Sequence, residues 1–179
     1  GMTSVFGYVS FAWLPILLIE HIGVSEFEGG SLLALFAIMG LPVSLIVPVL
    51  ADKYQRSHSL IVYFSATMGS IGALGLLFGP TSLAWLFVVC LGLGPTMFPL
   101  ALTLFNLRSR TRATVLAVSA FGQGVSYTLA TLMVFLVGVF REVTGGWELT
   151  LWLLFVVAAG SSIAGIQLAK HNFVDDELS

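Results

Sequence analysis

The chain has very little charge. Of its 179 residues, 58% are hydrophobic and only 9% are Asp, Glu, Lys or Arg, whereas a water-soluble domain usually carries about 25% charged residues. This composition excludes an ordinary soluble domain and predicts an all-α integral membrane protein. The formal net charge of -2 is too small to indicate nucleic acid or an acidic partner.

The residue types that most enzymes need are also scarce. The single cysteine, Cys90, lies in an apolar run, which excludes a disulfide framework and a Cys/His metal cluster and indicates a packing residue. No glycine cluster leads into Gly-Lys-Ser/Thr, and no Ser/His/Asp set or carboxylate pair falls at membrane depth. We therefore expect no enzyme activity, no cofactor and no metal.

Six apolar stretches dominate what is present, each near the roughly 20 residues that a membrane-spanning helix needs. Local signals separate them: Ser25 with Glu28 forms a capping box, Gly79-Pro80 ends one stretch, and Gly145-Gly146 breaks another. The predicted spans are Thr3–Glu20, Glu28–Ala51, Ser59–Phe78, Ser82–Asn106, Ala113–Phe140 and Trp147–Lys170. We expect residues 1–170 to form one bundle and residues 171–179 a short polar tail.

Basic residues orient the predicted bundle. Six of them follow the even-numbered spans and one, Arg141, lies on the opposite side. The six are Lys53, Arg56, Arg108, Arg110, Arg112 and Lys170. This positive-inside bias places both termini in the cytoplasm of a multi-pass protein of the cell membrane.

The interiors of the predicted spans contain no Asp, Glu, Lys, Arg or His. Ionisable groups at membrane depth cost at least about 2.5 kcal/mol and usually serve ion or proton movement. These helices therefore have no mid-membrane proton carrier.

A polar patch interrupts the fifth predicted span. Ser119, Gln123, Ser126 and Tyr127 follow helical spacing and share one face. A Gln facing lipid would leave its amide unsatisfied at a cost of a few kcal/mol. We expect this face to line a substrate path, with Gln123, Tyr127 and Ser119 contacting the substrate.

Two further spans carry candidate site residues. Pro95 and Pro99 should kink or partly unwind the fourth span near its middle, where Thr96 and freed backbone groups could meet a ligand. In the first span, Tyr8 and Trp13 could form an aromatic wall, although plain packing between helices fits Trp13 equally well. Trp147 and Trp152 fit a belt at the outer membrane interface.

Gly1 precedes Met2, and the first span begins without flanking Lys or Arg. We expect a fragment, whether Gly1 is a tag remnant or the start is internal to a longer chain.

Several stretches, taken together, resemble the second half of a major facilitator superfamily transporter, more narrowly the cyanate and nitroimidazole permease group. They are Tyr8–Pro15, Phe98–Leu104, Gln123–Tyr127 and Thr144–Trp147. The resemblance implies a parent of twelve helices in two six-helix halves, each built from two three-helix inverted repeats, with substrate held between the halves.

Asp52-Lys53 with Arg56 looks like the cytoplasmic-loop motif of this superfamily, with Pro48 and Gln55 where glycines are usual. The resemblance implies that Asp52 and Arg56 belong to a conformational-switch loop. Asp52 could lie against the positive N-terminal end of the fifth span.

The leading hypothesis is the C-terminal half of a secondary transporter that moves a small anion or small polar organic molecule, such as cyanate or a nitroimidazole, by alternating access. Its partners would be the substrate, the bilayer, and the N-terminal six-helix half or a second copy of the chain. Three alternatives stay open: a self-contained six-helix oligomeric channel or semi-transporter, an efflux carrier for an apolar drug, and a non-transporting membrane scaffold.

Overall fold

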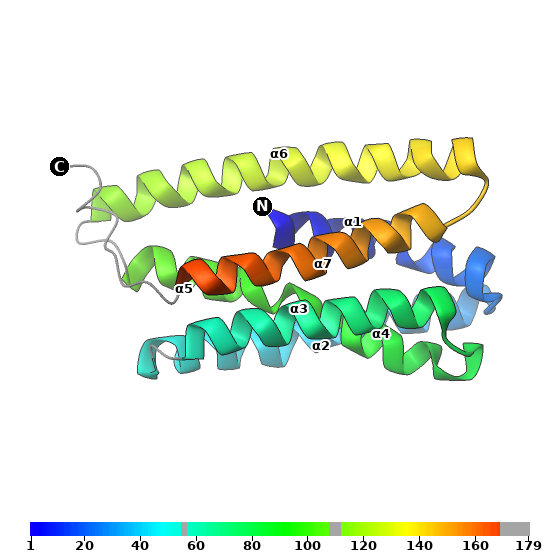
Figure 1. The fold of residues 1–179 in the computed structure, drawn as a ribbon, viewed down its shortest axis with the longest axis horizontal. Coiled ribbons are helices and arrows are strands. Elements are labelled where there is room, and N and C mark those ends of the chain that lie inside the picture. Colours follow the sequence, from blue (N-terminus) through cyan, green and yellow to red (C-terminus); the bar gives the residue numbers. More distant parts are fainter. Residues whose placement is uncertain (55–56, 108–111, 169–179) are drawn as a thin grey trace.

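A computed structural model describes residues 1–54, 57–107 and 112–168. The described chain is an elongated bundle whose consecutive helices run back and forth along one axis (Figure 1). Its elements in chain order are α1 (Met2–Leu17), η1 (Leu18–Ile22), α2 (Glu26–Lys53), α3 (Ser57–Phe78), η2 (Thr81–Leu83), α4 (Ala84–Leu93), η3 (Gly94–Thr96), α5 (Met97–Leu107), α6 (Arg112–Thr144) and α7 (Glu148–Leu168).

These elements confirm the six predicted apolar stretches. Among the described residues, five helices are long and apolar enough to cross a membrane, and Glu148–Ile163 forms a shorter apolar helix. The predicted tail, residues 171–179, and Arg56 both lie outside the described residues. The cytoplasmic orientation of the termini stays a prediction; Gly1 lies beside Ser126 and Leu129, partway along α6 (Figure 1).

The predicted breaks have clear local causes. Ser25 accepts a hydrogen bond from the Glu28 backbone N–H at 3.2 Å, and the Glu28 carboxylate accepts one from the Ser25 N–H at 3.0 Å, which completes the capping box before α2. Gly145 ends α6 with a φ of 72°, a left-handed conformation that is strained for other residues. The third predicted break, after Phe78, is also present.

The fourth predicted span is broken in the middle, as the two prolines indicated. A short 3₁₀ turn, η3, separates α4 from α5 at Gly94–Thr96, because a proline lacks the N–H that would continue the α-helical ladder. The Ser65 hydroxyl of α3 donates to the Gly94 carbonyl. A neighbouring helix thus satisfies one carbonyl at the break, as burial in an apolar medium demands.

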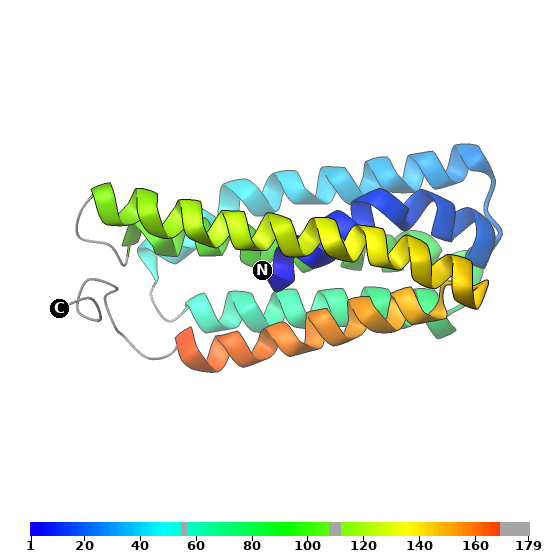
Figure 2. The same cartoon turned by 90° about the horizontal axis from the view of Figure 1, so that it is seen from above.

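The core lies around α1 and α3. In the apolar windows of these two helices, 44% of residues are buried, against 11% for α2 and for α6. Helices α3 and α7 lie side by side in both views (Figure 1, Figure 2). Gly72 permits close packing of α3 on α4, since a Cβ there would lie 2.7 Å from the Leu91 backbone nitrogen. The glycines of α3 are therefore packing residues.

Two groups lie differently from the sequence-based expectation. Trp147 is 2% exposed and lies inside the bundle, not in an outer belt, because its indole N–H donates to Glu20 at 2.8 Å. The third predicted span begins at Ser59, but α3 begins at Ser57 and therefore includes His58, which is 4% exposed. One ring nitrogen of His58 lies 2.8 Å from the Ala51 carbonyl in the last turns of α2, so it bridges the two helix ends.

Candidate transport site between α1, α2 and α6

Two open hollows flank α1 at mid-bundle. The first, which we call the α1–α2 hollow, has a volume of about 350 Å³. The second, the α1–α6 hollow, has a volume of about 390 Å³. Both volumes are within the range of small-molecule sites. Tyr8 and Phe11 line both hollows, so one face of α1 separates them.

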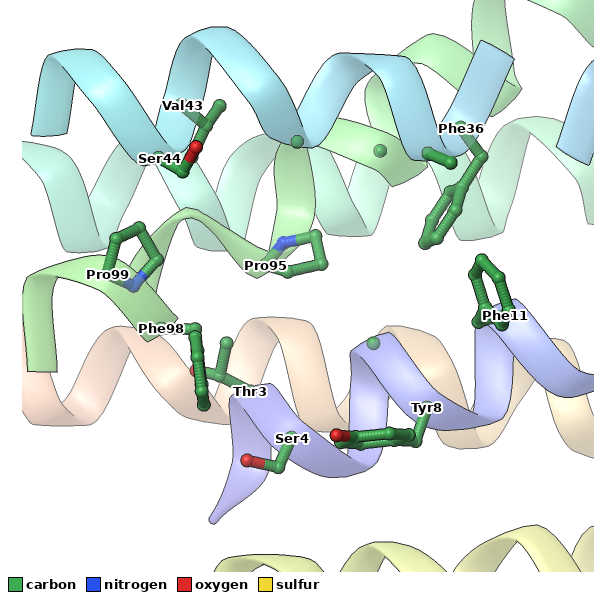
Figure 3. Close-up of a pocket in the computed structure, with 14 residues that line it drawn as sticks. Thr3, Ser4, Tyr8, Phe11, Phe36, Val43, Ser44, Pro95, Phe98 and Pro99 are labelled. Atoms are coloured by element: carbon green, nitrogen blue, oxygen red, sulfur yellow. The ribbon is translucent and has the colours of Figure 1, made fainter. Parts of the chain in front are cut away.

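The α1–α2 hollow is built mainly from rings and small groups. Phe11 of α1 and Phe36 of α2 face one another across the gap, and Pro95 of η3 lies between the two helices (Figure 3). The break at η3 therefore helps to shape this wall. The lining residues are Thr3, Ser4, Gly7, Tyr8, Phe11, Phe36, Ala37, Gly40, Val43, Ser44, Gly92, Pro95, Phe98 and Pro99.

The α1–α6 hollow is lined by two of the predicted site residues, Tyr8 and Tyr127, and a third, Gln123, is hydrogen-bonded to Tyr127 without lining the hollow. The Tyr8 and Tyr127 rings meet edge to face with centroids 5.8 Å apart. The Tyr127 hydroxyl donates to the Gln123 side-chain oxygen at 3.3 Å, along one face of α6. The sequence spacing on α6 placed Gln123 and Tyr127 together, and tertiary packing adds Tyr8.

The remaining predicted residues lie elsewhere. Ser119 is partly buried one turn from Gln123 on α6. Thr96 is 3% exposed and donates to the Leu93 carbonyl, facing an apolar hollow between α2 and α3. Trp13 packs between helices: its indole N–H donates to the Val134 carbonyl at 2.9 Å and its ring lies 5.7 Å from that of Trp147. Of the two alternatives for Trp13, these contacts favour packing.

Asp52 of the predicted switch loop is exposed at the end of α2. It lines an open hollow of about 550 Å³ together with Phe98, Pro99 and Thr103 of α5. A contact of Asp52 with the start of α6 stays a prediction.

Sequence reasoning missed much of the α1–α2 hollow. Gly40 lines the hollow, and a Cβ built there meets no atom within 4 Å. Phe36, Ser44 and Phe98 were not selected either. In sequence, an aromatic residue of a membrane helix looks the same whether it faces lipid, a neighbouring helix or a cavity. Only the rotation of the packed helix decides which of these its side chain faces.

The two hollows are lined by the same kinds of chemical group. Aromatic rings, hydroxyls and backbone groups provide stacking and hydrogen bonds, and no charged side chain occurs among the described residues that line the two hollows. Such a surface can bind a small molecule through rings and hydrogen bonds.

Comparison with known proteins decides the family. The sequence profile of the Major Facilitator Superfamily matches residues 1–131. The chain belongs to this superfamily. Members of this superfamily are membrane proteins, and the helical fold with several apolar helices of membrane length agrees with that assignment.

Three curated relatives match nearly all of this superfamily chain. A 2-nitroimidazole transporter of Escherichia coli (strain K12) is 32% identical over 167 residues, which cover 93% of this chain and 42% of the relative. The uncharacterized transporter YycB of Bacillus subtilis (strain 168) is 30% identical over 177 residues, or 97% and 43%. The cyanate transport protein CynX of Escherichia coli (strain K12) is 32% identical over 170 residues, or 93% and 43%.

The chain thus spans less than half the length of these relatives. No solved structure matches it significantly.

Proposed function

We propose that this chain is the C-terminal six-helix half of a secondary transporter that works by alternating access in the cell membrane. Its substrate is a small polar organic molecule or small anion, such as a nitroimidazole or cyanate. The relatives named for those two substrates support this range. The partner of the half is an N-terminal six-helix half or a second copy, and the termini are cytoplasmic.

One observation carries the proposal: Tyr8 and Tyr127 meet at an open hollow midway along the bundle, and the Tyr127 hydroxyl is hydrogen-bonded to Gln123 one turn earlier on α6. In a pair of rings held edge to face, the edge of one ring covers one face of the other, and the remaining faces are available for stacking on a flat molecule. The Gln123 amide and the Tyr127 hydroxyl supply donors and acceptors next to the rings. This combination suits a planar heteroaromatic ring with polar substituents.

The same hollow favours an uncharged member of the range. Because the described lining residues carry no cation, an anion such as cyanate would need its countercharge from the partner half. Ser119 extends the polar face of α6, and the backbone at Pro95 adds polar groups on the α2 side. Asp52 and Arg56 serve as the switch loop at the cytoplasmic end.

The test uses the full-length protein that contains these residues. Uptake of radiolabelled 2-nitroimidazole and of cyanate is measured in cells for the parent, Gln123→Ala and Tyr127→Phe. Each variant removes one hydrogen-bonding partner from the pair, so the KM for 2-nitroimidazole should rise by about fivefold. The control is Thr128→Val, an exposed hydroxyl of α6 that lines neither hollow. An unchanged KM and rate in both site variants would remove this face from the site.

An efflux carrier for an apolar drug is the second candidate, and the α1–α2 hollow favours it. Phe11, Phe36, Phe98 and two prolines give that hollow an almost wholly apolar wall. Energised inverted vesicles distinguish the two proposals: accumulation of an apolar dye by the parent, lost in Phe36→Ser, would support efflux.

A further inference from the structure

Helix α1 and its continuation η1 are joined to α6 at three levels. At the rim, Arg141 donates to both carboxylate oxygens of Glu20, at 2.6 and 3.1 Å. In the middle, the Trp13 indole N–H donates to the Val134 carbonyl at 2.9 Å. At the third level the Tyr8 ring meets the Tyr127 ring with centroids 5.8 Å apart.

The numbering of these contacts shows that the rim and middle contacts lie in register, whereas the third is offset by two residues. From Glu20 back to Trp13 is seven residues, and from Arg141 back to Val134 is also seven. Seven residues make two helical turns and return to nearly the same face. Tyr8 and Tyr127 continue the two runs by five and seven residues. Residue numbers rise together on the two helices from contact to contact, so α1 and α6 run parallel and the contacts form a parallel three-rung ladder.

The middle rung is enclosed on several sides. Gly138 of α6 makes room for the Trp13 indole, since a Cβ there would lie 3.0 Å from the ring. The Trp13 ring packs at 5.7 Å against Trp147, which is 2% exposed and donates its own N–H to Glu20 at 2.8 Å. Trp147 thus connects the middle rung to the rim.

We propose that Trp13 is a positioning residue for the substrate site and not a substrate contact, an inference that rests on the proposed function. Its polar atom is already bound to Val134, while its ring fixes the height and rotation of α1 against α6. Tyr8 lies five residues away on the same helix. Holding Trp13 therefore holds the Tyr8 edge against Tyr127, and α1 moves with α6 as one unit during transport.

The test uses the full-length protein in which Cys90→Ser removes the one cysteine of this chain. Spin labels attached to the substitutions Ile16→Cys and Leu116→Cys, at exposed positions of α1 and α6, report the distance between the two helices by pulsed electron paramagnetic resonance. Trp13→Phe removes the N–H but keeps a ring. Trp152→Phe is the matched control, because that ring packs on Phe78 and Phe155, away from the ladder.

We expect Trp13→Phe to shift or broaden the α1–α6 distance distribution and Trp152→Phe to leave it unchanged. The KM for 2-nitroimidazole should rise about fivefold, the effect of losing one hydrogen bond, while Vmax per molecule in the membrane stays within twofold. A merely structural role would lower the amount of protein and Vmax instead. Gly138→Ala adds a methyl group against the same ring from α6, and we expect it to change the distance distribution and to raise the KM as Trp13→Phe does.

The outcomes separate the two proposals. An unchanged distance distribution and an unchanged KM in both Trp13→Phe and Gly138→Ala would overturn the positioning role while leaving transport intact. If Trp13→Phe changes the distance distribution but the parent transports neither 2-nitroimidazole nor cyanate, the ladder is supported and the proposed function is refuted.

Discussion

Gly40 offers the sharpest test of the α1–α2 hollow. It lies within α2, and a Cβ added there meets no atom within 4 Å, so a larger side chain enters the hollow without moving the backbone. Replacing a helical glycine also removes a conformational penalty of about 0.8–1.0 kcal/mol relative to Ala. We expect Gly40→Trp to insert and fold at least as well as the parent while its indole occupies the space between Phe11 and Phe36.

The predicted consequence is a loss of transport without a loss of protein. Uptake of 2-nitroimidazole by Gly40→Trp in the full-length protein should fall at least tenfold, equivalent to about 1.4 kcal/mol, at an unchanged membrane level. Gly40→Ala should keep most of the uptake, because a methyl group leaves most of the hollow open.

A matched control separates blockage from a general effect of tryptophan. Gly30 lies in the first turns of the same helix, and a Cβ there also meets nothing within 4 Å, so Gly30→Trp should transport normally. Parental uptake by Gly40→Trp would refute the assignment of this hollow to the substrate path. Equal loss in both variants would show that α2 does not tolerate a large side chain.

Two further predictions concern packing and completeness. Gly72→Ala should lower the free energy of unfolding in detergent by about 1–3 kcal/mol, since its Cβ would lie 2.7 Å from the Leu91 backbone nitrogen and 2.8 Å from the Phe87 carbonyl oxygen, whereas the open Gly124→Ala should be neutral or stabilising; equal melting of the two variants would contradict the close approach of α3 and α4. Proteoliposomes that contain only residues 1–179 should show no 2-nitroimidazole uptake, and uptake should appear with the full-length protein. Robust uptake by the short chain would instead support a self-contained oligomer.

Much of the candidate site could be predicted where the relevant geometry lies within one helix. Gln123 and Tyr127 are four residues apart, so their hydrogen bond follows from helical periodicity alone. The break at Gly94–Thr96 follows from proline chemistry. Tyr8 was selected for its residue type, but its contact with Tyr127 joins positions 119 residues apart, and no local pattern encodes it.

Other residues were misread because burial depends on the partner helix. Tryptophan is a residue type typical of membrane interfaces, yet the Trp147 N–H donates to Glu20 and its ring packs against Trp13. Gly40 and Gly72 are both small residues in apolar helices, but one opens into a hollow and the other touches a neighbouring backbone. The rotation of each helix about its own axis distinguishes them, and that rotation results from packing.

The sequence by itself determined that this protein is helical and membrane-embedded, where its spans begin and end, and where the fourth span breaks. These features depend on hydrophobic length, caps and proline, all of which act within about a turn or a single span. Only the tertiary structure decided which faces meet: the two hollows beside α1, the ladder that joins α1 to α6, and the burial of Trp147. Those features depend on side chains that are far apart in the sequence and come together only when the helices pack.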